Sequence, residues 1–480
     1  MILVVDVGTS SVRAAVVDAD ARIVTEHREP SLPSSPMPGL VEFDATAIAE
    51  AVLRVAHAAL DAAGDVAAVG IANQRGSAIV WDRATGTPVA PGLGWQDLRT
   101  VGRCLELQGS DIWLGPNHSA TKLETLLDGA DPERAGDLCV GTVDSWVIWT
   151  LSNGALHFSD STNAQITGLR ATENGSWDER VLDTLRISER SLPAVIDSSG
   201  TVGPATALPG APPITGVLGD QQASLLGQGC VRAGDAKITF GTGGMLDVVL
   251  GADRPALGLR GDAGTFPLVT RRVEGTDMWG LEAVMLSAGT NVEWLRDDLG
   301  LVASAEDTDA VAASCADSGD VWFVPALLGL GTPHWDFGAR GTLVGLTRGT
   351  DRAHVVRAVL EGVAHRGADL VEAAEADSSH TIATVRVDGG MTANTVFVQA
   401  LADATQRPIE VSPVREATAL GAAFAAGAEI GWWATDDDIA ATWSPGARVE
   451  PGRPLDRDRW RDAVARAEKW IPDLSAVSFT

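Results

Sequence analysis

The sequence predicts an α/β protein with two large domains. Apolar segments of strand length alternate along the chain with longer segments that carry apolar residues at helical spacing. Each half also contains a tip rich in glycine and hydroxyl residues between two apolar strands. A chain of 480 residues is too long for one hydrophobic core, so the two halves are expected to fold as separate domains.

The first thirty residues are typical of an antiparallel meander with a polar tip. An apolar strand at 1–7 is followed by a Gly-Thr-Ser-Ser turn, a second strand, an Asp-Ala-Asp turn and a third strand. Residues 45–63 have the apolar spacing of a helix, and residues 66–74 form an apolar segment that ends in polar groups. Helices therefore alternate with strands in this half.

The same order of elements returns in the second half. Residues 236–251 predict a strand, a glycine turn and a strand, and residues 384–406 predict a strand, an Asp-Gly-Gly turn and a helix capped by Asn394. The boundary is placed in the segment Gly-Gln-Gly-Cys between the halves, which gives domains at 1–230 and 231–480.

Composition limits the partners of the chain. The formal charge of −28 repels phosphate backbones and anionic lipids, so we expect a small-molecule partner and neither nucleic acid nor membrane. Four cysteines have neither the pairing nor the density of a disulfide scaffold or zinc site. The N-terminus has no basic leader, and the apolar segment 417–428 is shorter than a membrane span, which predicts a cytoplasmic protein.

Several common chemistries have no residues to carry them. None of the three lysines, Lys122, Lys237 and Lys469, follows a G-x-x-x-x-G segment, so a Walker-type phosphate loop is absent. No histidine pair has the H-E-x-x-H spacing, and no serine stands in a G-x-S-x-G turn. A nucleotide site in this chain must therefore use another design.

The two glycine tips are candidates for a phosphate clamp. Residues 6–11, Asp-Val-Gly-Thr-Ser-Ser, are compatible with a simple hairpin turn, but residues 241–244, Gly-Thr-Gly-Gly, repeat the pattern in the other half. Two such tips that face each other offer backbone N–H groups to a nucleotide polyphosphate. Asp6 would repel phosphate unless a divalent cation lay between them, so we infer Mg²⁺ held by Asp6 through water.

The Asp-Gly-Gly turn at 388–390 has two interpretations. It is either a tight strand-to-helix turn without a ligand or part of the nucleotide site. Gly390 would let a flat base or ribose approach the backbone, and Asn394 would hydrogen-bond an adenosine while it caps its helix.

Taken together, these segments resemble the FGGY family of carbohydrate kinases, and within it the glycerol kinases most closely. The resemblance covers nearly the whole chain. It is carried by DVGTSSVRAAVVD (6–18), GIANQRGSAIVWDRATGTPV (70–89), GWQDLRT (94–100), SATK (119–122), GTVDSWVIW (141–149), GDQQASLLGQG (219–229), KITFGTG (237–243), VPALLGLGTPHWD (324–336), ARGTLVGLTRGT (339–350), VRVDGGMTANTVF (385–397) and REATALGAAFAAG (415–427). It implies an actin-like ATPase fold of two ribonuclease-H-like domains that close over ATP and a polyol or sugar.

The resemblance gives Asp220 a catalytic role. In this family the aspartate of the Gly-Asp-Gln segment accepts the proton of the substrate hydroxyl that attacks the γ-phosphate, and Asp220 occupies that position. A carboxylate suits this chemistry because it aligns the hydroxyl and takes its proton late in the reaction. A role as N-cap of the following helix is compatible with catalysis.

Nucleotide contacts follow by position from the same resemblance. The residues expected at the ATP phosphates are Thr9, Ser10, Ser11, Arg13, Gly241 and Thr242, and those expected at the nucleoside are Gly289, Glu293, Gly390 and Asn394. Glu293 stands where related enzymes often have glutamine, which adds a negative charge near the nucleotide.

The polyol side carries both matches and departures. Arg75, Trp95, Asp220 and Gln221 stand where glycerol kinases hold their polyol, although outside this motif context a surface ion pair for Arg75 and a core position for Trp95 would be the simpler interpretations. The departures are Gly76, where glycerol kinases have glutamate, and Asn117, where they have tyrosine. Gly76 is expected to enlarge the pocket, and each lost hydrogen bond costs about 0.5–1.5 kcal/mol.

We therefore expect ATP-dependent phosphorylation of glycerol or a glycerol-like polyol, with Asp220 as general base and Mg²⁺ bridging the ATP phosphates. A longer polyol or a ketose that uses the space at Gly76 is the alternative. A non-catalytic sugar-binding member and an actin-like ATPase acting on proteins are disfavoured, because Asp6 and Asp220 are both present and no client-binding region follows the helix at 461–476. The sequence leaves a homo-oligomer, dimer or tetramer, open.

Overall fold

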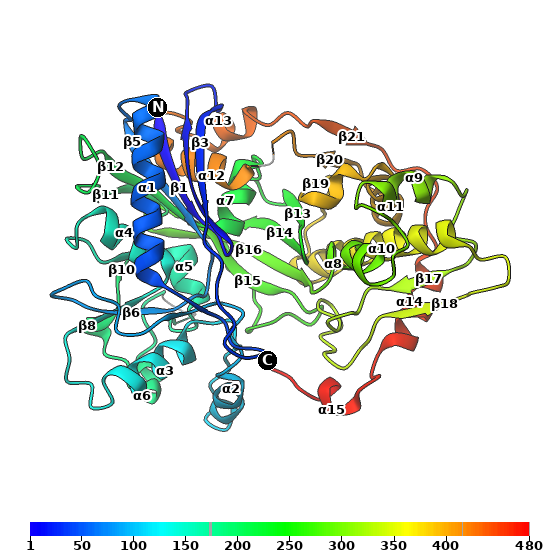
Figure 1. The fold of residues 1–480 in the computed structure, drawn as a ribbon, viewed down its shortest axis with the longest axis horizontal. Helices are drawn as coiled ribbons and strands as arrows, with labels where there is room; N and C mark the ends of the chain where they lie inside the picture. The colour runs from blue at the N-terminus through cyan, green and yellow to red at the C-terminus, as the bar shows by residue number, and fades with distance from the viewer. Residues whose placement is uncertain (172–174, 415, 480) are drawn as a thin grey trace.

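The protein consists of two lobes, each built on a mixed β-sheet with helices packed against it (Figure 1). The computed structural model describes residues 1–171, 175–414 and 416–479. The predicted α/β class is confirmed, and both glycine tips lie between strands as expected.

The first lobe contains a six-stranded sheet with the order β11-β12-β5-β1-β2-β3. Its strands are β1 (Ile2–Val7), β2 (Ser11–Val17), β3 (Ile23–Pro30), β5 (Ala68–Asn73), β11 (Ser199–Pro204) and β12 (Pro213–Gly219). The first three form the predicted antiparallel meander, whereas β1, β5 and β12 run parallel. The carboxyl ends of these parallel strands therefore meet at one edge, which brings Asp6, Arg75 and Asp220 to the same side of the sheet.

Alternating residues of β1 supply two separate cores. Leu3, Val5 and Val7 pack with α1 (Ala45–Ala63) and α4 (Val143–Leu151) on one face. On the other face, Ile2 and Val4 pack with α7 (Asp220–Gly227) and α12 (Ala417–Glu429). The remaining elements of this half are β4 (Glu42–Phe43), β6 (Ile79–Asp82), β7 (Gly92–Leu93), β8 (Leu138–Gly141), β9 (Phe158–Asp160), β10 (Ala194–Ile196), α2 (Val101–Gln108), α3 (Ala120–Ala130), α5 (Ser161–Ile166), α6 (Glu179–Leu185) and η1 (Glu189–Ser191).

The second lobe contains a seven-stranded sheet with the order β15-β16-β14-β13-β19-β20-β21. Its strands are β13 (Ala236–Phe240), β14 (Gly244–Gly251), β15 (Phe266–Val273), β16 (Thr276–Met285), β19 (Val385–Asp388), β20 (Ile409–Val411) and β21 (Ala447–Val449). The long helix α10 (Arg352–Ser378) and α11 (Thr395–Thr405) pack with this sheet in one core, and Asn394 caps α11 as predicted. The other elements are α8 (Thr290–Glu293), η2 (Trp294–Asp298), α9 (Asp307–Ala313), β17 (Trp322–Val324), β18 (Thr342–Val344), η3 (Gly390–Ala393), α13 (Asp436–Ala441), α14 (Arg457–Ala467) and α15 (Pro472–Ser475).

Helix α12 crosses from the second half of the chain to the first lobe, where it lies beside the blue strands of Figure 1. It packs directly on α7 through two glycines. A Cβ on Gly421 would lie 1.7 Å from the Ala223 carbonyl oxygen, and one on Gly227 would lie 1.9 Å from that of Ala417. A single cut at residue 230 assigns these two packed helices to different domains, and the proposed domain ranges stay a prediction.

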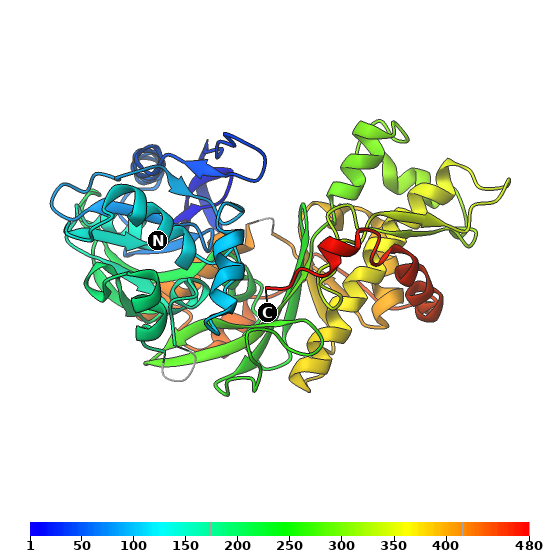
Figure 2. The same cartoon turned by 90° about the horizontal axis from the view of Figure 1, so that it is seen from below.

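The end of the chain returns toward the first lobe, as the red segment in Figure 2 shows. Phe479 contacts Phe337 of the second half, with ring centroids 6.0 Å apart, and packs against the core of α2 and α3. In the ranges that the structure describes, no helix has the length and apolar character needed to cross a membrane.

Replacing Gly421 with alanine is expected to lower the free energy of unfolding by about 1–3 kcal/mol, because the methyl group would overlap the Ala223 carbonyl. Gly102→Ala in α2 is the matched control, since nothing lies within 4 Å of its added Cβ, and it should gain about 0.5–1 kcal/mol. Denaturant unfolding measures both. Wild-type stability in Gly421→Ala would contradict the close packing of the two helices.

Candidate active site

Asp220 is the first residue of α7, directly after β12. The helix cap is Gly219, so the alternative role of Asp220 as N-cap does not apply: its Oδ1 accepts a hydrogen bond from the backbone N–H of Gln221 at 2.8 Å. Burial raises the pKa of the Asp220 carboxyl above its ordinary value, and the charges of Arg75 and Lys237 only partly oppose this shift. A carboxylate in this setting favours taking up a proton more than one in water does.

Arg75 lies beside Asp220 and is held from the other lobe. Its Nη2 donates to the Glu282 carboxylate of β16 at 2.5 Å, and its Nε lies 3.8 Å from Asp220 Oδ1. Only 10% of its side chain is exposed, which rules out a surface ion pair. Its Nη1 is buried, and within the described residues it has no hydrogen-bond partner. A buried donor without a partner is where a ligand oxygen fits best.

A second buried cation lies next to Gln221. The Lys237 Nζ is 2.9 Å from Asp247 Oδ2, and it donates to Gln221 Oε1 at 2.7 Å and to Thr239 Oγ1 at 2.9 Å. The side chains of Lys237 and Asp247 are 0% and 1% exposed. This cluster and the Arg75–Glu282 pair link the first lobe to β13, β14 and β16 of the second.

Trp95, one of the residues expected at the polyol, contacts the first glycine tip. Its Nε1 donates to Thr9 Oγ1 at 3.1 Å. Its backbone carbonyl accepts from the buried Lys122 ammonium, which also binds the carbonyls of Gly76 and His118. Burial lowers the pKa of Lys122 to about 7. Lys122 therefore holds the segments that contain Gly76, Trp95 and His118 close together.

The expected enlargement of the pocket at Gly76 is wrong. Gly76 has a φ of +72°, which side chains rarely adopt, and a Cβ there would lie 2.4 Å from the Asn117 carbonyl oxygen. Backbone of the segment that contains Asn117 thus fills the space expected to be vacant. The Asn117 residue is exposed, and its contact with a substrate stays a prediction.

The first glycine tip is closed by a hydrogen bond from Gly8 N–H to the Ser11 carbonyl at 3.0 Å, while Ser10 is exposed. Arg13 pairs with Asp6 at 3.1 Å and also with Glu416, so two carboxylates hold its guanidinium. Burial raises the pKa of Asp6 to about 6, with Asp220 close enough to contribute to the rise. The structure therefore brings the two predicted carboxylates together.

The second tip is joined to the expected nucleoside residues. Gly241 accepts from the Gly289 N–H at 2.9 Å, and Thr242 accepts from the Ala288 N–H at the same distance. A Cβ on Gly289 would lie 2.6 Å from the Gly241 oxygen, which explains the glycine there. Glu293 is exposed at the end of α8.

The Asp-Gly-Gly turn packs against the end of β13. A Cβ on Gly389 would lie 2.3 Å from the Phe240 carbonyl, whereas one on Gly390 would meet nothing within 4 Å. The Asn394 amide donates to Thr308 at 3.0 Å while its oxygen caps α11. Asp388 accepts from Ser224 and Gln228, so this turn contacts the helix that Asp220 begins.

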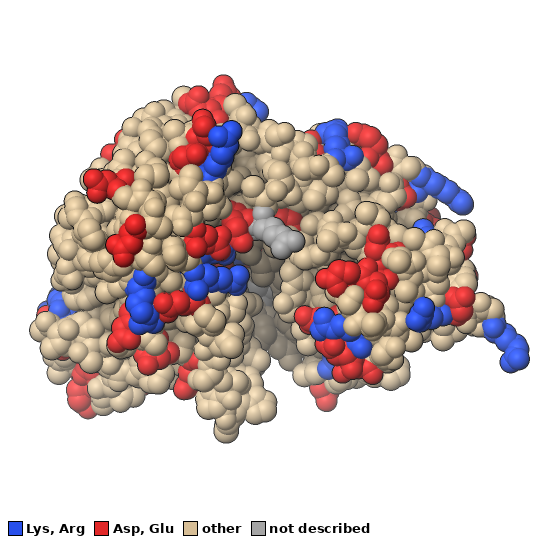
Figure 3. All heavy atoms as spheres, turned by 45° about the horizontal axis from the view of Figure 1, so that its top comes forward, with Lys and Arg blue, Asp and Glu red and all other residues tan. Residues whose placement is uncertain are grey.

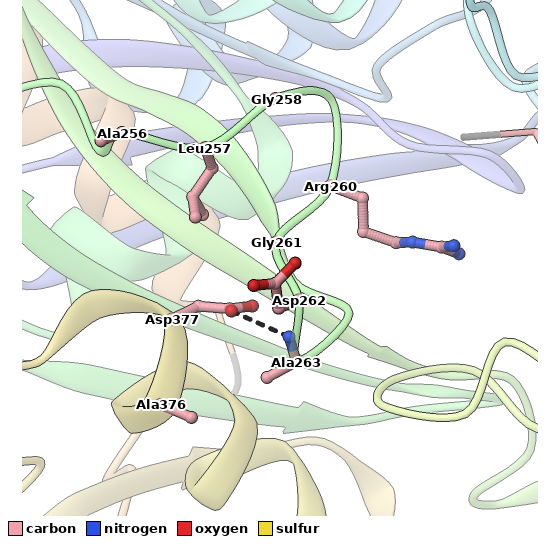
Figure 4. A pocket seen from close by; sticks show the side chains of 9 residues that line it. All are labelled: Ala256, Leu257, Gly258, Arg260, Gly261, Asp262, Ala263, Ala376 and Asp377. Carbon is pink, nitrogen blue, oxygen red and sulfur yellow. Dashed lines mark hydrogen bonds between the residues drawn. The ribbon is translucent and has the colours of Figure 1, made fainter.

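A groove between the two lobes is visible in Figure 3, with charged side chains of both signs beside it. A separate pocket of about 500 Å³ lies between the loop after β14 and the end of α10, where Asp377 accepts from the Ala263 N–H at 2.9 Å (Figure 4). None of the predicted site residues lines this pocket.

Sequence reasoning missed four charged residues of the site: Lys122, Lys237, Asp247 and Glu282. Three of them lie within strands and Lys122 within a helix, so no glycine turn marks them. A signal was present nonetheless, because Lys237, Asp247 and Glu282 are charged residues inside apolar segments.

Fold and geometry define a class of protein. The two lobes bring the half-buried Asp220 and two buried cations, Arg75 and Lys237, together at their junction, an arrangement that suits phosphoryl transfer to a hydroxyl. Models of the N-terminal and C-terminal domains of the FGGY family of carbohydrate kinases match residues 1–227 and 236–430. The chain belongs to the FGGY family of carbohydrate kinases and is an ATP-dependent kinase of this class.

Individual relatives agree with this assignment. The glycerol kinase of Trichlorobacter lovleyi is 42% identical over 497 residues, which cover 98% of this chain and 99% of that protein. The crystal structure of Plasmodium falciparum glycerol kinase with ADP has a TM-score of 0.90 at 28% identity, over 97% of this chain and 98% of that one. The xylulose kinase of Lactobacillus acidophilus, 20% identical with a TM-score of 0.86 over 99% of both chains, has the same fold. The expected actin-like ATPase fold is confirmed.

Replacing Glu282 with glutamine is expected to lower kcat/KM for the polyol about ten- to hundredfold, because Arg75 loses a charged hydrogen bond of about 1.5–3 kcal/mol that positions it. The KM for ATP should stay unchanged. Steady-state kinetics with each substrate varied in turn measures both.

Glu29→Gln, which removes an exposed ion pair with Arg54, is the control and should leave both parameters within about twofold. Wild-type kinetics in Glu282→Gln would contradict the positioning of Arg75.

Proposed function

We propose that this chain transfers the γ-phosphoryl group of ATP to a hydroxyl of glycerol. The observation that carries the proposal is the group formed by Asp220, Arg75 and Gln221, in which one carboxylate and an unpartnered buried donor lie at the junction of the lobes. Relatives that are glycerol kinases at about 40% identity over nearly the full chain support the same substrate.

Asp220 is proposed as the general base. Its Oδ1 is occupied by the Gln221 N–H, which leaves Oδ2 to accept the proton of the attacking hydroxyl. Arg75 and Gln221 would hold the neighbouring hydroxyls, and Trp95 would cover the carbon chain. Holding the alcohol in line with the phosphorus is most of the catalysis in such transfers.

The two glycine tips would hold the phosphates of ATP. The first lobe would contribute backbone N–H groups and hydroxyls of Thr9, Ser10 and Ser11, and the second lobe would contribute Gly241 and Thr242. Arg13 would exchange Glu416 for a phosphate oxygen, since both are anionic partners for the same guanidinium.

The nucleoside is proposed to bind at Gly289, Glu293, Gly390 and Asn394. The open space at Gly390 supports close approach of a flat group there.

The residues fit a magnesium ion. No group of three or more possible protein ligands occurs in the described parts of the chain, but Mg²⁺ with ATP needs only one or two carboxylates besides phosphates and water. Asp6, at the end of β1 beside the first tip, would supply that carboxylate. When bound, Mg²⁺ would neutralise charge on the transferring phosphoryl group.

A longer polyol or ketose has no structural support, since the space expected at Gly76 is filled by backbone. A panel of glycerol, tetritols, pentitols and ketoses in a coupled ADP-release assay decides the substrate. Glycerol should give the highest kcat/KM, whereas activity confined to ketoses would contradict the proposal. A cytoplasmic location, homo-oligomer formation and lack of nucleic-acid or membrane binding stay predictions.

Asp220→Asn is expected to lower kcat by about 10²–10⁴-fold, because the amide cannot accept the proton. Its affinity for ADP should stay close to that of the wild type, since the nucleotide residues are untouched. Calorimetric titration with ADP and a coupled kinetic assay measure the two quantities. Residual turnover near the wild-type rate would contradict the assignment of Asp220.

The pH dependence should follow the raised pKa of Asp220. As pH falls through that pKa the base becomes protonated, so kcat/KM for glycerol at saturating ATP should decline at a pH above 3.8, the ordinary value for aspartate. The same carboxyl binds protons more readily in the folded than in the unfolded chain, so its contribution to stability rises as pH falls through its folded pKa. A profile of kcat/KM that stays flat down to pH 3.8 would contradict the role of Asp220 as the base.

A further inference from the structure

We infer that Lys237, kept charged by Asp247, is a positioning residue that fixes the side-chain amide of Gln221 as a hydrogen-bond donor toward the polyol. The inference rests on the proposed function and extends it, because it states which hydrogen-bonding pattern the substrate must present. Neither Lys237 nor Asp247 needs to touch the substrate, because both act through Gln221.

The orientation of Gln221 follows from the chemistry of its partner. An ammonium group has only donors, so the amide atom 2.7 Å from Lys237 Nζ must be the carbonyl oxygen. The amide nitrogen of Gln221 then points away from Lys237. Within the described ranges, the structure shows no hydrogen bond from that nitrogen, and Gln221 is only half-buried. Its two N–H donors are available to a ligand.

Asp247 keeps Lys237 charged, and the charged Lys237 keeps the side-chain oxygen of Gln221 turned toward it. Burial by itself lowers the pKa of Lys237, but the carboxylates of Asp247 and Asp388 outweigh burial and raise the pKa above its ordinary value. A neutral amine could accept as well as donate, and Gln221 could then turn either end toward it. The buried ion pair therefore has a consequence for specificity besides its effect on stability.

Arg75 repeats this arrangement beside Asp220. Its guanidinium also has only donors, Glu282 holds one of its nitrogens, and Nη1 is left without a partner. The pocket thus offers one acceptor, Asp220, together with two fixed donors. This pattern suits a polyol in which one hydroxyl donates to the base while neighbouring hydroxyls accept.

The test uses wild type, three variants and the combination of the first two, each assayed with glycerol, propane-1,2-diol and propane-1,3-diol. Lys237→Met/Asp247→Leu removes both buried charges and so leaves neither one unpaired. Gln221→Met removes the amide itself. Thr239→Val, which keeps the Lys237 ammonium and its contact with Gln221, is the matched control. The readouts are kcat/KM for each diol, the KM for ATP, and the melting temperature.

Wild type should prefer glycerol over at least one of the diols by about tenfold, the cost of a donor left without its partner. The Lys237→Met/Asp247→Leu variant should lose most of this preference through a higher KM for glycerol, with the KM for ATP within about twofold. Adding it to Gln221→Met should produce no further loss of preference, because both changes act on one contact. Thr239→Val should keep the wild-type preference.

Three results would overturn the inference while leaving the proposed function intact. They are an unchanged preference in Lys237→Met/Asp247→Leu, a further loss of preference when that change is added to Gln221→Met, and an equal loss of preference in Thr239→Val. If wild type phosphorylates none of the three substrates, the proposed function itself fails, and the inference fails with it. A Lys237→Met/Asp247→Leu protein that does not fold is replaced by Lys237→Gln/Asp247→Asn, for which the same outcomes apply.

Discussion

The buried charges between the lobes are the interaction on which the rest of the site depends. Arg75 and Asp220 come from strand ends of the first sheet, whereas Glu282, Asp247 and Lys237 come from strands of the second. Charges this deeply buried are stable only when each has a partner, and removal of one partner is costly. The network therefore fixes the position of the proposed base and of the two proposed donors near it, and it couples that geometry to the contact between the lobes.

Much of the fold could be predicted because its signals are local. The meander of the first thirty residues, the helix at 45–63 and the cap at Asn394 each follow from apolar spacing and turn residues within a short segment. The crossing of α12 to the first lobe could not be predicted in this way. Its cause is the match between Gly421 and Gly227, two residues far apart in sequence whose missing side chains let the helices touch.

The site was predictable where chemistry stands beside a glycine turn. Asp6 lies near the end of β1, and Arg75, Asp220 and Gln221 follow the ends of β5 and β12, so their motifs predicted them as site residues. Lys237 and Glu282 were missed because a charge inside an apolar segment indicates a function but does not say which one until its partner is known. The partner is Asp247 on the neighbouring strand for Lys237 and Arg75 of the first lobe for Glu282. Gly76 shows the opposite error, since a small residue was taken for empty space when its positive φ and the Asn117 backbone are the reason for it.

The most direct test of the central claim is a crystal structure of the enzyme with glycerol and ADP. We expect one glycerol hydroxyl within hydrogen-bond distance of Asp220 Oδ2, about 2.6–3.2 Å, with other hydroxyls on Arg75 Nη1 and the Gln221 amide nitrogen. Glycerol bound away from Asp220, or with the Gln221 oxygen turned toward it, would contradict the roles assigned to these two residues.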